Sequence, residues 1–305
     1  DYAASTPLDA GGLKVMKPFL LSAYGNPSSL HHKGMETRKA VEASRRTVAK
    51  ILKARPKEII FTSGGTESCN LAIFGVAKSR GEKGHIVTTQ IEHHAVLEPI
   101  KELERQGWKV SYLPVNSEGI ISLNDVKKAI RKNTVLLSVM YANNEIGTVE
   151  PIAEISKWLK GENQKRKARR LQPIIFHTDA CQGAGYLDIN VEKLKVDLMS
   201  VNGSKIYGPK GTGFLYVRQG TLILPIVHGG GQENGIRSGT ENIPGIAGLA
   251  KALNLVQNDR LKESNRLFKL SDYAIKKIHQ KISKVIINSP NINRLPNIIN
   301  LTFKG

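Results

Sequence analysis

The sequence has 305 residues, a mass of 33.5 kDa and a formal net charge of +19, with 40% hydrophobic and 23% charged residues. This balance is close to that of globular proteins, so it excludes a wholly disordered chain. No apolar run approaches the roughly 20 residues that a membrane span requires. Two cysteines cannot form a disulfide framework. We therefore expect a globular protein of the reducing cytoplasm, without membrane attachment.

Seven short apolar runs recur along the first 217 residues. They are rich in β-branched residues and are apolar at consecutive positions, which is typical of strands buried on both faces of a sheet. The runs are Glu58–Ser63, His85–Thr89, Val110–Val115, Thr134–Met140, Pro173–Thr178, Asp197–Val201 and Gly213–Val217.

Helical patterns separate these runs. Leu123, Val126 and Ile130 stand at helical spacing after Ser122, a residue type that caps helix starts. A similar spacing recurs after Pro151, and proline is favoured in the first turn of a helix. The alternation of strands and helices predicts an α/β fold in which a mainly parallel, seven-stranded sheet is sandwiched by helices.

The pattern changes near Thr240, where a long helix with one apolar face is predicted. Two strand-like segments, Val285–Ile287 and Ile298–Phe303, follow it. The positions that mark the apolar face of the helix are Leu267, Leu270, Ala274 and Ile278.

The two ends of the chain suggest a segment of a longer protein. No basic and apolar signal sequence opens it, and the first residue is Asp rather than Met. We expect a large domain formed by residues 13–248. A smaller, incomplete α+β domain is expected from residues 1–12 together with 249–305.

Part of the basic excess lies between Lys160 and Arg170, where six lysines and arginines stand against one acid, Glu162. We interpret this run as a solvated loop between a helix and a strand. A surface for RNA or for a protein partner is the alternative, since a positive excess attracts anions in general. We do not expect nucleic acid as a partner, because no aromatic residues alternate with the cations, as stacking on single-stranded bases would require.

Polar residues that directly follow an apolar run are candidates for a site, because ligands in open parallel sheets bind beyond the carboxyl ends of the strands. The first candidate is Ser63–Glu67, SGGTE, which ends a run and opens a helix. Glycines and the free N–H groups of a helix start can cradle a phosphate, with the Thr66 hydroxyl as a further donor. An ordinary strand–helix turn with a threonine cap fits the same residues, so both interpretations stay open.

Asp179 and Lys205 follow two later runs. A carboxylate at a buried strand end needs a cationic partner, which is either a protonated ring nitrogen of a cofactor or a structural Lys or Arg. Lys205 can form a Schiff base with an aldehyde if it is desolvated or lies beside another cation. Otherwise it is one of the many surface lysines of the chain.

Glu92, His93 and His94 stand just beyond another run. An imidazole there can stack on a flat ring and move protons near neutral pH. We expect no metal site, because adjacent histidines project differently and no third ligand stands at helix spacing. A phosphate cradle, a carboxylate for a ring nitrogen, a stacking imidazole and a reactive lysine together predict pyridoxal 5'-phosphate as the cofactor.

The chain resembles the cysteine desulfurases of the NifS/IscS type, which are class V aminotransferases of the fold-type I pyridoxal phosphate enzymes. The resemblance extends over nearly the whole chain and implies their fold. The matching segments are DYAASTP at Asp1, YGNPSSLH at Tyr24, FTSGGTES at Phe61, IEHHAVL at Ile91, ANNEIGT at Ala142, HTDACQ at His177, NGSKIYGPKGTGFLY at Asn202, HGGGQENGIRSGTEN at His228 and LPNIINLTF at Leu295.

The resemblance implies roles for individual residues. Lys205 is implied to bind the cofactor covalently and to move protons at the substrate Cα, His93 to stack on the ring, and Asp179 to keep the ring nitrogen protonated. Gln182 is implied to face the phenolic oxygen, and Asn144 to lie near the ring and the substrate. The residues implied to bind phosphate are Gly65, Thr66 and Ser204, with Thr240 reaching the phosphate of a neighbouring subunit.

The implied reaction is that of a sulfurtransferase: the sulfur of L-cysteine passes to a thiolate, which gives a persulfide and L-alanine. A homodimer is implied, as is a sulfur acceptor, either an iron–sulfur scaffold protein or a tRNA-thiolation partner. The alternatives are a selenocysteine lyase or another class V aminotransferase, and a non-catalytic assembly or RNA-binding protein that has kept the fold.

Two departures from the family pattern stand out. Ser204 replaces the histidine that usually precedes the reactive lysine, and its hydroxyl can still donate to phosphate. The persulfide cysteine and the substrate-binding arginine of the family lie beyond Gly305, so we expect this segment alone to bind the cofactor without turnover. Cys69 and Cys181 are expected to be small buried packing residues, although the position of Cys69 near a helix start favours a lowered thiol pKa.

Overall fold

The computed structural model describes residues 1–304, and its centre is a seven-stranded sheet with the order β1-β7-β6-β5-β4-β2-β3. Strand β7 runs antiparallel to both of its neighbours, and the other pairs are parallel. Each strand overlaps one predicted apolar run, so the mainly parallel sheet is confirmed. The strands are β1 (Ile59–Thr62), β2 (His85–Thr89), β3 (Lys109–Leu113), β4 (Thr134–Ser138), β5 (Ile175–Asp179), β6 (Leu198–Asn202) and β7 (Gly213–Val217).

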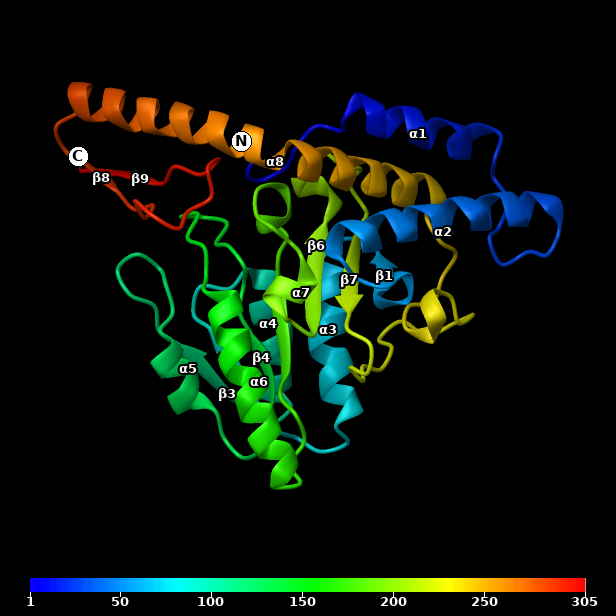
Figure 1. Ribbon diagram of the computed structural model, residues 1–305, viewed down its shortest axis with the longest axis horizontal. Coiled ribbons are helices and arrows are strands. Elements are labelled where there is room, and N and C mark those ends of the chain that lie inside the picture. Colours follow the sequence, from blue (N-terminus) through cyan, green and yellow to red (C-terminus); the bar gives the residue numbers. More distant parts are fainter. Residues whose placement is uncertain (305) are drawn as a thin grey trace.

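Helices cover both faces of this sheet (Figure 1). Helices α3 and α4 pack on one face, while α2, α5, α6, α7 and the first part of α8 pack on the other. The helices are α1 (Ala10–Leu21), α2 (His32–Leu52), α3 (Gly65–Ser79), α4 (His94–Arg105), α5 (Leu123–Ala129), α6 (Ile152–Ala168), α7 (Val191–Leu194) and α8 (Ile243–Lys281). Short 3-10 turns are η1 (Pro56–Glu58), η2 (Gly183–Gly185), η3 (Gly203–Lys205) and η4 (Glu233–Gly235).

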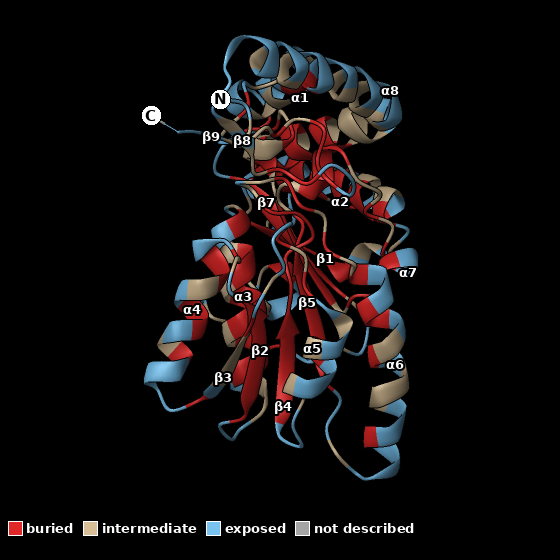
Figure 2. Cartoon of the chain, turned by 90° about the vertical axis from the view of Figure 1, so that its left-hand side faces the viewer, coloured by how far each residue is buried: buried red, intermediate tan, exposed pale blue. Residues whose placement is uncertain are grey.

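The consecutive apolar residues of the strands are explained by two separate cores. In β1, Ile60 packs under α3 and α4, whereas Ile59 and Phe61 pack against the helices of the opposite face. Successive side chains of a strand point to opposite faces, so both sets of positions must be apolar. Figure 2 shows the resulting band of buried strands. The edge strand β3 is the exception, with only Leu113 buried.

The strand directions decide where the site lies. Strand β1 runs parallel to β6 because both are antiparallel to β7. The carboxyl ends of β1, β2, β4, β5 and β6 therefore meet at one edge of the sheet. The predicted site residues Gly65, His93, Asn144 and Lys205 lie in the segments that follow these strands, and Asp179 ends β5, which brings distant parts of the sequence together.

The C-terminal region contains α8 and a small antiparallel sheet of β8 (Val285–Ile287) and β9 (Leu301–Phe303). Figure 1 shows α1 and α2 beside the first half of α8, and β8 and β9 beside its second half. The expected division between residues 248 and 249 lies within α8 and stays a prediction. Within residues 1–304, no helix combines the length and the apolar composition that a membrane crossing demands.

The predicted apolar face of α8 is wrong at one position. Leu270 is 53% exposed, whereas Leu267 is half-buried against Leu295 and Ile298, and Ser271 is buried. The inward face of the helix therefore follows positions 267, 271, 274 and 278, at the spacing of a continuous helix. Leu270 lies one position away from Ser271 and points towards solvent.

The basic run from Lys160 to Arg170 is not a loop, as predicted, but mostly the second half of α6. Five of its six cations are exposed, as predicted, but Arg166 is buried, with 3% exposure. Its guanidinium donates hydrogen bonds of 2.9–3.0 Å to four carbonyl oxygens, those of Gln172, Arg131, Lys132 and Thr134. These bonds tie α6 to the turn before β4.

We expect Arg166→Met to lower the free energy of unfolding by roughly 2–4 kcal/mol, because the four carbonyl oxygens lose a charged donor inside the protein. Lys167→Met, at the exposed neighbouring position, is the matched control and should change the stability by less than about 0.5 kcal/mol. Urea unfolding of the three proteins measures the difference. Equal midpoints for the two variants would contradict the structural role of Arg166.

Candidate active site

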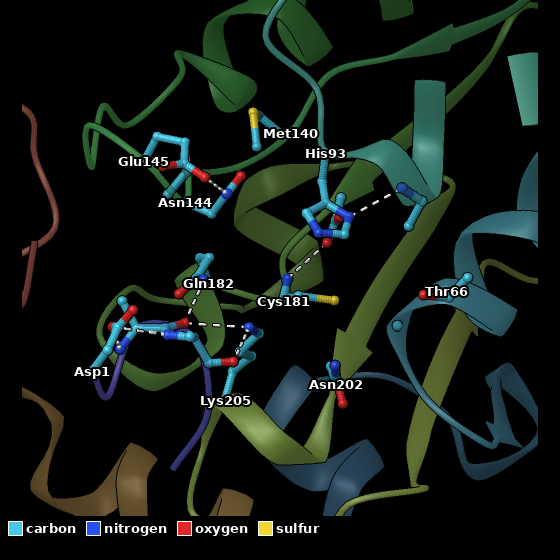
Figure 3. Close-up of a pocket in the computed structure, with 16 residues that line it drawn as sticks. Asp1, Thr66, His93, Met140, Asn144, Glu145, Cys181, Gln182, Asn202 and Lys205 are labelled. Carbon is cyan, nitrogen blue, oxygen red and sulfur yellow. Dashed lines mark hydrogen bonds between the residues drawn. The ribbon is translucent and has the colours of Figure 1, made fainter. Parts of the chain in front are cut away.

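A cavity of about 300 Å³ lies at the sheet edge where the strand ends meet. Figure 3 shows His93 and Lys205 on opposite sides of this cavity, with Thr66 at one end and Asn144 at the other. The lining brings together seven of the nine predicted site residues, namely Gly65, Thr66, His93, Asn144, Asp179, Gln182 and Lys205. The other two, Ser204 and Thr240, are outside the lining.

The turn between β1 and α3 has the geometry of a phosphate cradle. Gly64 has a φ of +152°, which side-chain-bearing residues rarely adopt. A Cβ atom at Gly65 would lie 2.7 Å from Cys181 Sγ, so only glycine fits there. Gly64 is the N-cap residue and no side chain caps the helix, which rules out Thr66 as a threonine cap. The first N–H groups of α3 are thus available to an anion.

Asp179 is a nearly buried carboxylate at the end of β5, with 6% exposure. Its Oδ1 accepts a hydrogen bond from the Cys181 N–H, 2.9 Å away. Over residues 1–304, none of the ion pairs involves Asp179. The alternative that a structural Lys or Arg pairs with this carboxylate is therefore not found among these residues. A buried carboxylate that faces a cavity and forms no ion pair with residues 1–304 suits a cationic group of a ligand.

Lys205 lies in η3, and its ammonium points into the cavity rather than into bulk solvent. Its Nζ donates to the carbonyl oxygens of Ala3, at 3.2 Å, and of Ala4, at 2.5 Å. Gln182 Nε2 also donates to the Ala3 carbonyl oxygen, at 2.9 Å (Figure 3). The first residues of the chain therefore hold the lysine and the glutamine in place.

His93 is oriented by its own helix. Its Nδ1 accepts a hydrogen bond of 3.0 Å from the Ala95 N–H, which makes His93 the N-cap of α4. This bond leaves Nε2 as the protonated nitrogen of the neutral ring. His94 is exposed and lies 3.8 Å from Glu98, so it turns away from the cavity. Only one of the two histidines can stack on a ligand.

Ser204 and Thr240 lie outside the cavity. The Ser204 backbone N–H donates to Asn202 Oδ1, and its carbonyl oxygen accepts from Thr6. The predicted contact of its hydroxyl with phosphate stays a prediction. Thr240 is exposed between η4 and α8, so its predicted contact with a neighbouring subunit also stays a prediction.

The cavity also contains residues for which the sequence predicted no role. Asn202 ends β6 and is the first residue of the NGSK motif, and Met140 follows β4, so their positions at strand ends would have identified both. Glu145 accepts a hydrogen bond of 2.8 Å from Asn144. The remaining lining residues are Asp1, Ala3, Ala4, Ala95, Ala142 and Cys181, and of these the sequence described only Cys181, as a packing residue.

The prediction of small buried packing residues is confirmed for Cys69 but only partly for Cys181. Cys69 is fully buried in α3, while Cys181 is half-buried and lines the cavity, with its Sγ 3.8 Å from the Ser200 carbonyl oxygen. The predicted lowering of the Cys69 pKa is wrong. Burial and the nearby charge of Asp179 raise the pKa of both thiols well above its ordinary value. Both are therefore poor nucleophiles.

A buried histidine supports the strands below Asp179. His177 Nδ1 lies 2.8 Å from Ser138 Oγ, and its Nε2 lies 3.0 Å from Ser200 Oγ. These contacts link β4, β5 and β6 through one ring. Burial lowers the pKa of His177 to about 4, so the ring is neutral at physiological pH.

Comparisons with known proteins identify the family of the chain. All 305 residues match the aminotransferase class-V family, and the chain belongs to that family. It is 52% identical to the cysteine desulfurase IscS of Dictyoglomus turgidum over 304 residues, which cover 99% of this chain and 75% of the relative. It is 46% identical to the cysteine desulfurase IscS of Methanosarcina thermophila over 306 residues, which cover 100% of this chain and 73% of that relative.

Solved structures of related proteins have the same fold. A NifS-like protein with 38% identity superposes with a TM-score of 0.94 and covers 99% of this chain and 80% of its own. SspA in complex with cysteine has 39% identity and a TM-score of 0.86, and covers 100% of this chain and 83% of its own. The predicted fold type is therefore confirmed over the whole chain.

The pKa of His177 predicts a pH dependence of stability. The unfolded histidine binds a proton below its ordinary pKa of 6.5, whereas the folded one stays neutral until about pH 4. Protonation of this histidine should therefore lower the free energy of unfolding by about 3 kcal/mol as the pH drops from above 6.5 to below about 4. Urea unfolding at several pH values should show a weaker pH dependence for His177→Gln. The exposed His279→Gln is the control, and a slope for His177→Gln as steep as that of the wild type would contradict the prediction.

Proposed function

We propose that the protein is a cysteine desulfurase, which uses pyridoxal 5'-phosphate to remove the sulfur of L-cysteine and leave L-alanine. The observation that carries this proposal is the presence of Lys205 and Asp179 in one cavity, next to the open start of α3. The family and the names of the relatives support the same reaction.

The residues of the cavity fit the proposed cofactor. The N–H groups at the start of α3, with the Thr66 hydroxyl, suit its phosphate. Asp179 suits its ring nitrogen, and the imidazole of His93 suits a flat ring. Gln182 is assigned to its phenolic oxygen. When bound, pyridoxal phosphate supplies an aldehyde for amines and a ring that withdraws electrons from the substrate Cα.

Lys205 is assigned the proton transfers at the substrate Cα. Its neutral amine accepts the Cα proton, and the resulting ammonium has acceptors ready in the carbonyl oxygens of Ala3 and Ala4. The Asp179 carboxylate is assigned to hold the proton on the ring nitrogen, which would make the ring a better electron acceptor. Asn144 is assigned to the side of the cavity where the substrate enters.

The overall reaction balances with one thiol acceptor. The C–S bond of cysteine breaks, an S–S bond forms on the acceptor thiolate, and a proton takes the place of sulfur on the substrate, so the products are alanine and a persulfide. Cys69 and Cys181 do not suit the acceptor role, because their raised pKa leaves little thiolate near neutral pH. A thiolate outside these two positions must accept the sulfur.

We also infer that the enzyme works in the cytoplasm as a homodimer and passes sulfur to an iron–sulfur scaffold or another acceptor protein. The exposed Thr240, next to η4, is the residue proposed to reach the phosphate of the second subunit. The two unpaired cysteines suit a reducing compartment.

The proposal is tested with the protein as its gene encodes it, loaded with pyridoxal phosphate and given L-cysteine and a reducing thiol. We expect alanine and sulfide in equal amounts. Asp179→Asn should lower kcat about 100-fold, because an amide does not hold a proton on the ring nitrogen. Asp125→Asn, on the remote helix α5, is the matched control and should keep the full rate.

The absence of both products from the wild-type protein would refute the proposed activity. If Asp179→Asn kept the wild-type kcat while cysteine was consumed, the activity would stand and the assignment of Asp179 would be wrong.

A further inference from the structure

An ion pair joins the phosphate cradle to the segment before α8. Arg237 Nε donates to Glu67 Oε1 at 2.7 Å, and Arg237 Nη2 donates to Glu67 Oε2 at 3.3 Å, so the guanidinium grips both carboxylate oxygens. Both side chains are mostly buried, with exposures of 23% for Arg237 and 15% for Glu67. Glu67 Oε2 also accepts the Ser63 N–H, at 2.8 Å. The pair is therefore a fixed part of the turn between β1 and α3.

The position of Glu67 creates an electrostatic conflict. It lies in the first turn of α3, directly after Thr66, where the helix start attracts negative charge. An uncompensated carboxylate there would repel a phosphate dianion through a mostly buried, weakly screened environment. The guanidinium of Arg237 cancels this charge at the carboxylate itself.

Arg237 is held in place by a second anchor of the same segment. Glu233 forms a buried ion pair with Arg45 at 2.7 and 2.8 Å, and its Oε2 accepts the Phe61 N–H at 2.9 Å. Figure 1 shows η4, which contains Glu233, beside β1 and α2. The segment is thus fixed at Glu233 and again at Arg237, on either side of the cradle turn.

Glu67 stays charged over the working pH range. Burial alone would raise its pKa, but the hydrogen bonds from Arg237 and Ser63 outweigh burial and lower the pKa below its ordinary value. The cradle therefore contains the negative charge of Glu67, and a cation must compensate this charge whenever phosphate binds.

We propose that Arg237 is a positioning residue that acts through Glu67: it neutralises the carboxylate and so keeps the start of α3 attractive to the phosphate of the cofactor. This inference rests on the proposed function, because the phosphate is that of pyridoxal phosphate. It assigns a role to an arginine outside the cavity lining.

The test compares two ligands that differ only in the phosphate, pyridoxal 5'-phosphate and pyridoxal, in absorbance titrations of the cofactor-free protein. Arg237→Gln should raise the Kd for pyridoxal phosphate roughly tenfold and leave the Kd for pyridoxal unchanged. Arg237→Lys should retain most of the affinity, because the charge remains. Arg266→Gln, which removes an exposed ion pair with Glu263 on α8, is the matched control and should bind both ligands like the wild type.

Two variants of Glu67 separate charge compensation from a purely structural role. Glu67→Gln in the Arg237→Gln background should restore the affinity for pyridoxal phosphate, since neither charge remains. Glu67→Gln alone should bind pyridoxal phosphate at least as tightly as the wild type, because Arg237 then adds an uncompensated positive charge. This single variant decides the question even if Arg237→Gln does not fold.

Three results would overturn the inference: equal weakening of both ligands by Arg237→Gln, an unchanged Kd for pyridoxal phosphate, or weaker binding of pyridoxal phosphate to Glu67→Gln. The proposed function survives each of these results as long as the wild-type protein binds pyridoxal phosphate. If the wild type binds neither ligand, the proposed function fails and this inference fails with it.

Discussion

A buried carboxylate without a cation is the constraint on which the rest of the site depends. Asp179 lies at the end of β5, almost removed from solvent, and its Oδ1 accepts a backbone N–H from Cys181. Burial of such a carboxylate is unfavourable unless a cation pairs with it. The folded chain leaves a cavity at that point instead of a side chain. The protein therefore leaves open an interaction that suits the cationic ring of the proposed cofactor.

The remaining groups are arranged around this carboxylate by the sheet. Because β1, β2, β4, β5 and β6 end at the same edge, the segments that follow them surround one space. Lys205 reaches this space from η3 and the phosphate cradle from the start of α3. Beneath it, the neutral His177 joins three strands through hydrogen-bond contacts with Ser138 and Ser200. Phosphate at one end and a ring nitrogen at the other would set the orientation of the cofactor.

Much of this arrangement could be predicted from the sequence, because the strands and their ends are local signals. Each apolar run became a strand, and residues just after runs, such as Asp179 and His93, line the cavity. The failures have a common cause, which is that tertiary contacts are invisible in local patterns. Arg166 has the pattern of a surface charge but is buried against four carbonyl groups. The helix-start position of Cys69 favours a lowered thiol pKa, although the thiol is desolvated beside Asp179. The hydrogen bonds from Lys205 to the carbonyl oxygens of Ala3 and Ala4 join residues about 200 positions apart, so no rule of sequence spacing could predict these contacts.

The central claim is that the amine of Lys205, and no other, bonds to the aldehyde of pyridoxal phosphate beside Asp179. Reduction of the loaded protein with borohydride would make that bond permanent, and peptide mapping by mass spectrometry would locate it. The account predicts one phosphopyridoxyl group per chain, on Lys205. A label on a different lysine, or no stable label at all, would contradict it.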